Sequence, residues 1–388
     1  MTSELTTAEL DVVRARVAGL GRVPDATDVA DALRWAGHVV SDETVLVTQE
    51  ELRRDSVGAG LLDPLLHEAG VTDVLVNGPD RVFVDRGEGL VPAGVTFPSD
   101  EAVRRLATRL AALVGRRLDE GSPFVDARLP DGTRVHAVLS TLASPGTCLS
   151  LRVPARRRLS LDDWVRLGSV STRAADLLRS MVERRVAFMV SGGTGTGKTT
   201  LLSSLLGLVP GSERILIVED SRELHPDHPH VVRLEARPPN AERAGAITLT
   251  DLVRQALRMR PDRVVLGEVR GAEICDLLLA LNTGHEGGCG TVHANSATDV
   301  PARLEALAAL GGLPRDAAHA QLAAALEVVV HVARSASGQR RVAEIATLVR
   351  DLHGHVASVP GWTCDEAGTE ARGESWPELA RRLGATSW

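Results

Sequence analysis

Short apolar runs alternate with helical patterns through the second half of the chain. Continuous apolar runs predict buried strands, whereas apolar residues that recur every three or four positions predict helices. The expected strands are 186–190, 214–219, 263–269 and 288–294, and the expected helices are 199–208, 250–260, 271–282 and 297–309. This alternation predicts a mostly parallel sheet that helices cover on both faces, with a ligand site at the carboxyl ends of the strands. We place this α/β domain at residues 171–350 and expect 328–332 to pair with 341–348.

A smaller α+β domain is predicted at residues 58–153, where the apolar runs are shorter and turn residues are more frequent. Asp100 is expected to cap a helix that runs from Glu101 to Val114. Strands are expected on either side of this helix, at 71–76, 81–85, 90–97, 125–129, 134–139 and 148–153.

The remaining segments are expected to be less regular. Residues 1–55 carry helical patterning and are predicted to form a leading helical segment. Residues 154–170 are assigned to a basic linker, with helices expected at 161–167 and 172–185. The tail, residues 351–388, is expected to pack loosely onto the body of the protein. The linker contains Arg156, Arg157 and Arg158, and the tail contains Trp362, Trp376 and Trp388.

Charge and cysteine content argue against several functions. The formal net charge is −7 and the pI is near 6.0, whereas a protein that wraps nucleic acid needs a dominant basic surface. The four cysteines include no C-x-x-C pair, which argues against a zinc site and against a disulfide framework. The first residues lack a secretion signal, and no apolar stretch approaches the roughly 18 residues of a membrane span. We therefore expect a cytoplasmic protein.

A glycine-rich loop contains the only lysine of the chain, Lys198, and every other basic position is arginine. The sequence from Gly192 to Thr199 matches the phosphate-binding pattern G-x-x-x-x-G-K-[ST] between a predicted strand and a predicted helix. Its glycines let backbone amides converge on phosphate oxygens, and a compact ammonium suits that crevice better than a planar guanidinium. We expect a nucleotide to bind here, with Thr199 as a Mg²⁺ ligand. The predicted binding residues are Gly192, Gly193, Thr194, Gly195, Thr196, Gly197, Lys198, Thr199 and Thr200.

Two further predicted strands have carboxylates at their ends. The transfer of a phosphoryl group to water needs such groups to hold Mg²⁺ and to orient the attacking water. The strand 214–219 ends in Glu219 and Asp220. We expect Glu219 to support the metal or its waters, and a helix cap or a turn is the alternative. The strand 263–269 contains Glu268, where most phosphate-loop enzymes have an aspartate. Because glutamate reaches one methylene further, we assign Glu268 as the residue that activates the attacking water and also place it near the metal.

Two histidines, His285 and His293, flank a glycine-rich approach to the strand at 288–294. Histidine is a common zinc ligand, but no other candidate ligands accompany this pair. A phosphate-sensing role suits the setting better, and we expect His293 to contribute to catalysis.

These four segments, in this order, resemble the Walker A, Asp box, Walker B and His box of the motor ATPases that drive type II and type IV secretion and type IV pilus assembly. Residues 257–263 followed by 267–271 resemble the branch that powers tight-adherence (Flp) pili and its conjugation relatives. Residues 74–81 and 125–134 of the smaller domain resemble the same branch. The resemblance covers about residues 58–350.

The resemblance implies an ATPase that uses ATP and Mg²⁺, with a RecA-like P-loop domain. It further implies a hexameric ring in which ATP binds between the smaller domain and the RecA-like domain. Arginines of the smaller domain approach the γ-phosphate in such relatives, and the matching positions are Arg134 and Arg152, with Arg128 a weaker match. The implied partners are platform proteins in the inner membrane, which would hold the motor at the inner face of the cell membrane.

Two other functions are considered. A nucleotide-gated scaffold would bind ATP without hydrolysing it, and the four intact segments argue against that function. A RecA-like nucleic-acid translocase is suggested by the kinship with conjugation proteins. The acidic net charge and the scarcity of aromatic residues argue against direct contact with DNA. We therefore expect a mechanochemical ATPase that passes domain motion to membrane platform proteins.

Overall fold

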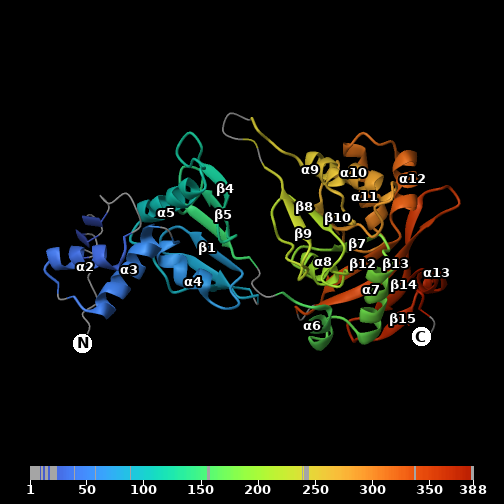
Figure 1. Ribbon diagram of the computed structural model, residues 1–388, viewed down its shortest axis with the longest axis horizontal. Coiled ribbons are helices and arrows are strands. Elements are labelled where there is room, and N and C mark those ends of the chain that lie inside the picture. The colour runs from blue at the N-terminus through green and yellow to red at the C-terminus, as the bar shows by residue number, and fades with distance from the viewer. Residues whose placement is uncertain are drawn as a thin grey trace. The chain divides into compact units, whose positions relative to one another are not determined.

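The computed structural model divides the chain into two compact units, residues 1–155 and residues 156–388 (Figure 1). It describes residues 24–385, apart from 39, 57, 88, 155–157, 238, 240–243 and 336–337, together with residues 9, 12, 13, 16 and 17. Most of the first 23 residues, the linker arginines Arg156 and Arg157, and Trp388 therefore lie outside the described residues. Within the described residues, no helix has the length and apolar character that a membrane crossing needs.

The first unit contains two helices ahead of its sheet, α2 (Ala26–Trp35) and α3 (Asp42–Ser56). The side chain of Asp25 caps α2 by accepting hydrogen bonds from the backbone amides of Thr27 and Asp28. The two helices share a small apolar core that is separate from the core of the following sheet. Of the leading helical segment predicted at residues 1–55, the helices at 26–35 and 42–56 are confirmed, and most of the first 23 residues lie outside the described residues.

A six-stranded antiparallel sheet follows, with the strand order β3-β2-β1-β6-β5-β4 among the described residues. The elements are η2 (Gly60–Leu62), α4 (Asp63–His67), β1 (Asp73–Asn77), β2 (Val82–Asp85), β3 (Leu90–Pro92), α5 (Asp100–Leu113), β4 (Phe124–Arg128), β5 (Arg134–Val138) and β6 (Cys148–Arg152). Helix α5 packs on the sheet through Val103, Leu106 and Leu110.

The cap predicted for α5 was wrong by one residue. The hydroxyl of Ser99 accepts the hydrogen bond from the amide of Ala102, so Ser99 is the capping residue. Asp100 instead accepts hydrogen bonds from the amide of Thr147, at 2.6 Å, and from its hydroxyl, at 3.1 Å. Its carboxylate therefore ties the helix to the loop before β6.

The second unit is built on a nine-stranded sheet, with the order β15-β14-β13-β12-β7-β11-β10-β8-β9 in the part of the chain that is described. The strands from β12 to β9 in that order are parallel, and β13, β14 and β15 are antiparallel. The strands are β7 (Phe188–Gly192), β8 (Ile215–Glu219), β9 (Val231–Glu235), β10 (Arg263–Val269), β11 (Cys289–His293), β12 (Val328–Arg334), β13 (Arg340–Arg350), β14 (Val356–Cys364) and β15 (Glu370–Arg372). The predicted parallel sheet and the predicted pairing of β12 with β13 are confirmed.

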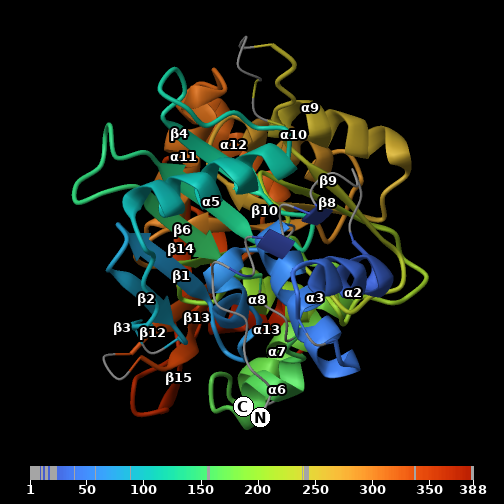
Figure 2. The same ribbon diagram turned by 90° about the vertical axis from the view of Figure 1, so that its left-hand side faces the viewer.

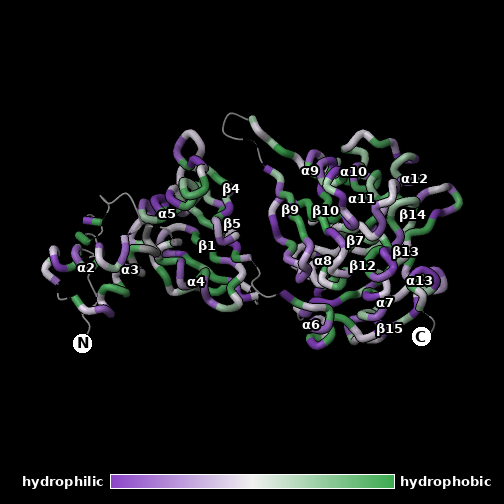
Figure 3. Tube along the Cα trace, viewed as in Figure 1, coloured by the Kyte–Doolittle hydropathy of each residue, from purple (hydrophilic) through white to green (hydrophobic). Residues whose placement is uncertain are grey.

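Helices cover both faces of this sheet, as the alternating pattern predicts (Figures 1 and 2). One face carries α6 (Leu161–Arg166), α7 (Thr172–Glu183), α8 (Lys198–Leu206) and α13 (Trp376–Leu383). The other face carries α9 (Leu249–Ala256) with the turn η3 (Leu257–Met259), α10 (Glu273–Leu281), α11 (Val300–Leu310) and α12 (Arg315–Ala325). The strands inside the sheet are largely hydrophobic, because they are buried from both sides (Figure 3).

The tail is part of this sheet, so the prediction that it packs loosely was wrong. Trp362 on β14 has an exposed fraction of 0% and lies opposite Ile345 of β13. Helix α13 covers the strand, because its Leu379 packs closely against Gly361. Part of the predicted linker is also integral, since α6 buries Leu161 and Trp164 in the core of the second unit.

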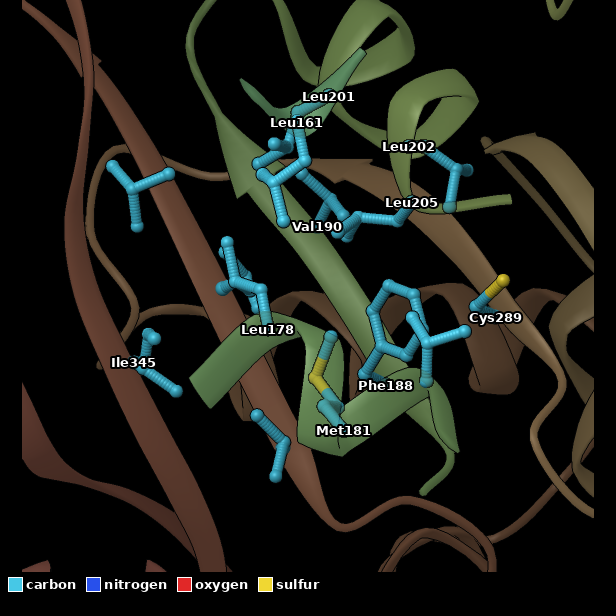
Figure 4. Packing of buried hydrophobic residues seen from close by; sticks show 14 of the residues in the cluster. Leu161, Leu178, Met181, Phe188, Val190, Leu201, Leu202, Leu205, Cys289 and Ile345 are labelled. Atoms are coloured by element: carbon cyan, nitrogen blue, oxygen red, sulfur yellow. The ribbon is translucent and has the colours of Figure 1, made fainter. Parts of the chain in front are cut away.

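The core under α7 and α8 fixes the position of β7 (Figure 4). Phe188 and Val190 of β7 point into this core, where they meet Met181 of α7 and Leu205 of α8. Each large apolar side chain buried in this way contributes roughly 1.5–3 kcal/mol to stability. The strand that leads into the glycine-rich loop is therefore held firmly in the middle of the sheet.

Candidate nucleotide site

The glycine-rich loop leaves the end of β7 and enters α8, which is the context that the sequence predicts. Gly195 and Gly197 have positive φ angles of 74° and 95°, where a side chain is strained. Gly192 has a φ of 153°, and a Cβ there would lie 2.3 Å from the carbonyl oxygen of Val332 on β12. The pattern of glycines is therefore required by the path of the loop.

The loop presents backbone donors to an anion. The amides of Gly195, Thr196 and Gly197 donate no hydrogen bond to any described residue. They lie at the N-terminus of α8, where the helix dipole favours negative charge. The loop keeps its shape through the hydroxyl of Thr196, which donates to the carbonyl oxygen of Gly193 at 2.9 Å. A chain of phosphates fits this set of donors.

Lys198 lies across the mouth of the loop, with 7% of the residue exposed. Its Nζ donates to the carbonyl oxygen of Gly193 at 2.7 Å and lies 3.3 Å from Nδ1 of His293. Burial lowers the pKa of Lys198, and the nearby carboxylate of Glu268 opposes this effect. An ammonium that is partly desolvated in this way interacts strongly with phosphate oxygens.

Glu268 and His293 meet beside the lysine because their strands, β10 and β11, are neighbours in the sheet. Nε2 of His293 lies 2.9 Å from Oε1 of Glu268. A ring that donates from Nε2 to a carboxylate has Nδ1 free to accept from the ammonium of Lys198, so these partners assign the tautomer. Burial and the charge of Lys198 lower the pKa of His293, which keeps the ring neutral near pH 7.

Arg270 is the second partner of Glu268, and the sequence alone did not identify it. Its guanidinium lies 2.6 Å from Oε2 of Glu268 and 3.7 Å from Asp220 at the end of β8. Burial alone would raise the pKa of Glu268, but the hydrogen bond and charge of Arg270, with the charges of His293 and Lys198, hold it below its usual value. Glu268 is therefore ionised at neutral pH.

The loop that carries Arg270 is fixed by a further residue that the sequence did not single out. Oε1 of Glu273 accepts hydrogen bonds from the amides of Arg270, at 2.6 Å, and of Gly271, at 2.7 Å. The segment from Gly267 to Gly271 was the available signal, because it places an arginine two residues after the glutamate.

Glu219 lies at the end of β8, and its local contacts are those of the turn that we considered as the alternative. Oε1 accepts hydrogen bonds from the amides of Glu223 and Leu224, each at 2.9 Å. Burial raises the pKa of Glu219 to about 7, although both hydrogen bonds oppose that rise. Oε2 is buried and has no hydrogen-bond partner among the described residues. The side chain also explains Gly267, since a Cβ there would lie 2.5 Å from Cγ of Glu219.

The groups expected around Mg²⁺ lie at the same edge of the sheet. Thr199 is half-buried in the first turn of α8, next to Lys198. Among the described residues no group of three or more histidine, cysteine or acidic side chains is placed to hold a metal. Magnesium typically binds one or two protein oxygens and completes its shell with waters and phosphates. Thr199 and Glu268 fit that pattern, and when bound the ion would neutralise charge on the phosphates.

The two histidines of the glycine-rich segment are separated by the strand between them. His293 ends β11 at the phosphate edge, whereas His285 precedes β11 and lies at the opposite edge. Nδ1 of His285 lies 3.2 Å from the carbonyl oxygen of Ala280. At about 3.3 Å per residue, the length of β11 keeps the two rings too far apart to share one zinc ion.

The three arginines named in the smaller domain lie in one row across its sheet. Arg128, Arg134 and Arg152 occupy directly opposite positions on β4, β5 and β6. Residues opposite each other on neighbouring strands share a face of the sheet, so the row presents three guanidinium groups together. Asp73 on β1 continues the row, and its carboxylate lies 3.0 Å from Nε of Arg152.

The fold and this site define a P-loop ATPase with a RecA-like domain. A family model described as type II/IV secretion system protein matches residues 55–374. The chain is 54% identical over 333 residues to a putative conjugal transfer protein of Mycobacterium tuberculosis, covering 84% of this chain and 94% of that protein. It is 31% identical to the conjugal transfer protein TrbB of Rhizobium radiobacter, covering 75% of this chain and 88% of that protein. The chain therefore belongs to the type II/IV secretion system protein family and is a motor ATPase of a secretion or conjugation system.

Solved structures agree on the fold. The pilus retraction motor PilT with bound ADP superposes with a TM-score of 0.52 at 17% identity, covering 83% of this chain and 84% of that chain. The ATPase DotB of Yersinia pseudotuberculosis gives a TM-score of 0.51 at 20% identity, covering 80% of this chain and 78% of that chain.

Proposed function

We propose that this chain powers a tight-adherence (Flp) pilus or a closely related conjugation machine. The proposed ATPase chemistry rests on a continuous set of contacts, which runs from Lys198 through His293 and Glu268 to Arg270. Three neighbouring strands, β7, β11 and β10, deliver these groups to one edge of the sheet. The resemblance of residues 257–263 and 267–271 to the Flp branch supports the more specific assignment.

In this proposal each residue has a defined task. Lys198 and the loop amides hold the phosphates of ATP, and Thr199 and Glu268 contribute oxygens toward Mg²⁺. Glu268, which is ionised, orients the attacking water and accepts its proton. His293 senses the phosphate through Lys198, because Nδ1 accepts a hydrogen bond from the ammonium and Nε2 donates to the carboxylate of Glu268. Glu219 would support Mg²⁺ through the waters around it, and its Oε2 has no hydrogen-bond partner among the described residues.

The small domain supplies the cations for the transition state. We assign this role to Arg134 and Arg152, with Arg128 beside them in the same row. The contact of Arg152 with Asp73 must be exchanged for a phosphate contact when ATP is engaged. In a homohexamer, each of six sites would gain and lose these arginines in turn, which couples the state of the phosphate to domain motion.

The partners in this proposal are platform proteins of the inner membrane, and the motor works at the inner face of that membrane through them. The net charge of −7 does not favour direct binding to nucleic acid. A nucleic-acid translocase is the second candidate function, because some of the relatives are conjugal transfer proteins.

One set of ATPase assays tests both the chemistry and the partner. Turnover is measured for the wild type, Lys198→Ala and Glu268→Gln, alone, with single-stranded DNA, and with liposomes that contain a pilus platform protein. We expect Lys198→Ala to lose binding and turnover, and Glu268→Gln to bind ATP while its turnover falls at least about 100-fold. Stimulation by the liposomes supports the pilus motor. Stimulation by DNA alone would favour the translocase, and wild-type turnover in Glu268→Gln would refute the assignment of the base.

A further inference from the structure

A buried hydrogen bond lies directly behind the phosphate-binding loop. Oγ of Ser191 lies 2.9 Å from Nδ1 of His331. Ser191 is on β7, immediately before Gly192, and His331 occupies the opposite position on the parallel strand β12. Ser191 is 0% exposed and His331 is 8% exposed, so water does not compete for this contact.

Val332, which follows His331 on β12, lies close to the start of the phosphate-binding loop. The carbonyl oxygen of Val332 would lie 2.3 Å from a Cβ at Gly192, and Oγ1 of Thr196 would lie 2.8 Å from it. The backbone of β12 therefore packs directly against the first residue of the loop. If His331 shifted relative to Ser191, the backbone of β12 would shift as well. Gly192, the first glycine of the loop, would then change position because it lies against that backbone.

The surroundings keep the imidazole neutral. Burial lowers the pKa of His331, and the charges of Arg341 and Lys198 act in the same direction, whereas Asp299 opposes them. Glu344 lies opposite His331 on β13. A neutral ring has one donor and one acceptor nitrogen, so Nδ1 forms an ordinary hydrogen bond with the serine hydroxyl.

We propose that His331 is a positioning residue for the phosphate-binding loop and that it acts through the hydroxyl of Ser191. This inference rests on the proposed role of the loop in holding the phosphates of ATP. The hydrogen bond of His331 is to Ser191, whereas Glu268 and His293 contact each other, Arg270 and Lys198. The loss of His331 is therefore expected to change nucleotide affinity far more than turnover at saturation.

The test is a double-mutant cycle on the full chain. ADP affinity is measured by calorimetry, and KM and kcat for ATP are measured in parallel, for Ser191→Ala, His331→Ala and the double variant. Each single change is expected to weaken ADP binding and raise KM about five- to tenfold, which lies within the range for one hydrogen bond, with kcat within about twofold. The double variant is expected to lose no more than either single variant, because both remove the same bond.

Two further variants separate positioning from general destabilisation. His331→Asn places an amide where Nδ1 lies and is expected to keep ADP affinity within about twofold of the wild type. His319 is the matched control: it is a buried histidine at 3% exposure, with hydrogen bonds to Glu305 and the amide of Val356, away from the loop. His319→Ala is expected to lower the melting temperature without changing ADP affinity.

The possible outcomes decide the proposal. Wild-type affinity in Ser191→Ala, or additive losses in the double variant, would overturn it. Ser191→Ala keeps the test decisive even where His331→Ala does not fold, because it removes only one hydroxyl. A wild-type protein that does not bind ADP would instead overturn the assignment of the loop, and this inference with it.

Discussion

Nε2 of His293 lies 2.9 Å from Oε1 of Glu268, and Nδ1 of the same ring lies 3.3 Å from Nζ of Lys198. The imidazole thus connects the residue assigned to phosphate binding with the residue assigned to water activation. Because the lysine contacts Nδ1, the ring proton is on Nε2 and points to the carboxylate. A change at the phosphate can therefore reach Glu268 through Lys198 and His293.

The first prediction follows from this bridge. His293→Ala removes one of the two partners of Glu268 but leaves the loop that holds the phosphates in place. We expect kcat for ATP to fall about 10- to 100-fold while ADP affinity stays within about threefold. His293→Gln can restore a donor near the position of Nε2 and is expected to recover part of the rate. Phosphate release and calorimetry measure the two quantities, and an unchanged kcat in His293→Ala would remove His293 from the mechanism.

The second prediction concerns Arg270. Its hydrogen bond and charge help to hold the pKa of Glu268 below the usual value, so Arg270→Gln raises that pKa. Less of the carboxylate is then ionised in mild acid, and the acid limb of the profile of kcat/KM against pH moves to higher pH. At pH 7 we expect kcat/KM to fall about fivefold, because Glu268 has lost one orienting bond.

Arg254→Gln is the matched control for Arg270→Gln. Arg254 also pairs with a carboxylate in the second unit, Asp276, but outside the nucleotide site. The control is expected to keep the wild-type pH profile. An Arg270→Gln profile whose acid limb coincides with the wild type would contradict the account of Glu268.

The third prediction uses the buried carboxylate of Glu219. Its pKa is about 7 in the folded chain and near 4.5 when exposed, so the folded state binds more protons between those values. Stability therefore falls as pH rises from 4.5 to 7 and changes little above 7. Glu219→Gln does not titrate and gains roughly 2–3 kcal/mol relative to the wild type between pH 5 and 8.

Urea unfolding without nucleotide, at several pH values, measures this difference. Glu286→Gln, which changes an exposed carboxylate, is expected to follow the wild type. If the stability of Glu219→Gln tracks the wild type across the whole range, Glu219 is not a buried titrating group.

The fourth prediction tests the tail. Trp362 is fully buried between the sheet and α13, so Trp362→Ala is expected to cost about 3–5 kcal/mol of stability. Trp376 is half-buried and lies under the guanidinium of Arg372, with 5.4 Å from Cζ to the ring centre. Trp376→Ala is expected to cost less than about 2 kcal/mol. Equal and small losses in both variants would mean that the tail does not belong to the core.

The sequence predicts the middle of the sheet well for a physical reason. The strands β7, β10 and β11 are short and mostly buried, and each has a distinctive polar or glycine residue at or next to its carboxyl end, namely Gly192, Glu268 and His293. Buried parallel strands have this pattern, and their carboxyl ends meet at one edge. The sequence therefore predicts at which edge of the sheet the site lies.

Other features depend on contacts that a linear pattern does not contain. The spacing places Arg270 two residues after Glu268, but many arginines in the chain follow acidic residues in this way, and its proximity to Asp220 arises only where β10 and β8 lie side by side. The two backbone amides that donate hydrogen bonds to the Glu219 carboxylate are placed by the path of the loop after β8. The core role of Trp362 was missed because glycine and polar residues surround it in the tail.

ATP binding by purified full-length protein, measured by calorimetry with Mg²⁺ for the wild type and Lys198→Ala, tests the central claim most directly. We expect micromolar binding to the wild type and a loss of at least about 100-fold in Lys198→Ala, because the ammonium is the principal cation of the loop. Equal affinities in the two proteins would show that ATP does not bind at this loop, and would contradict the account.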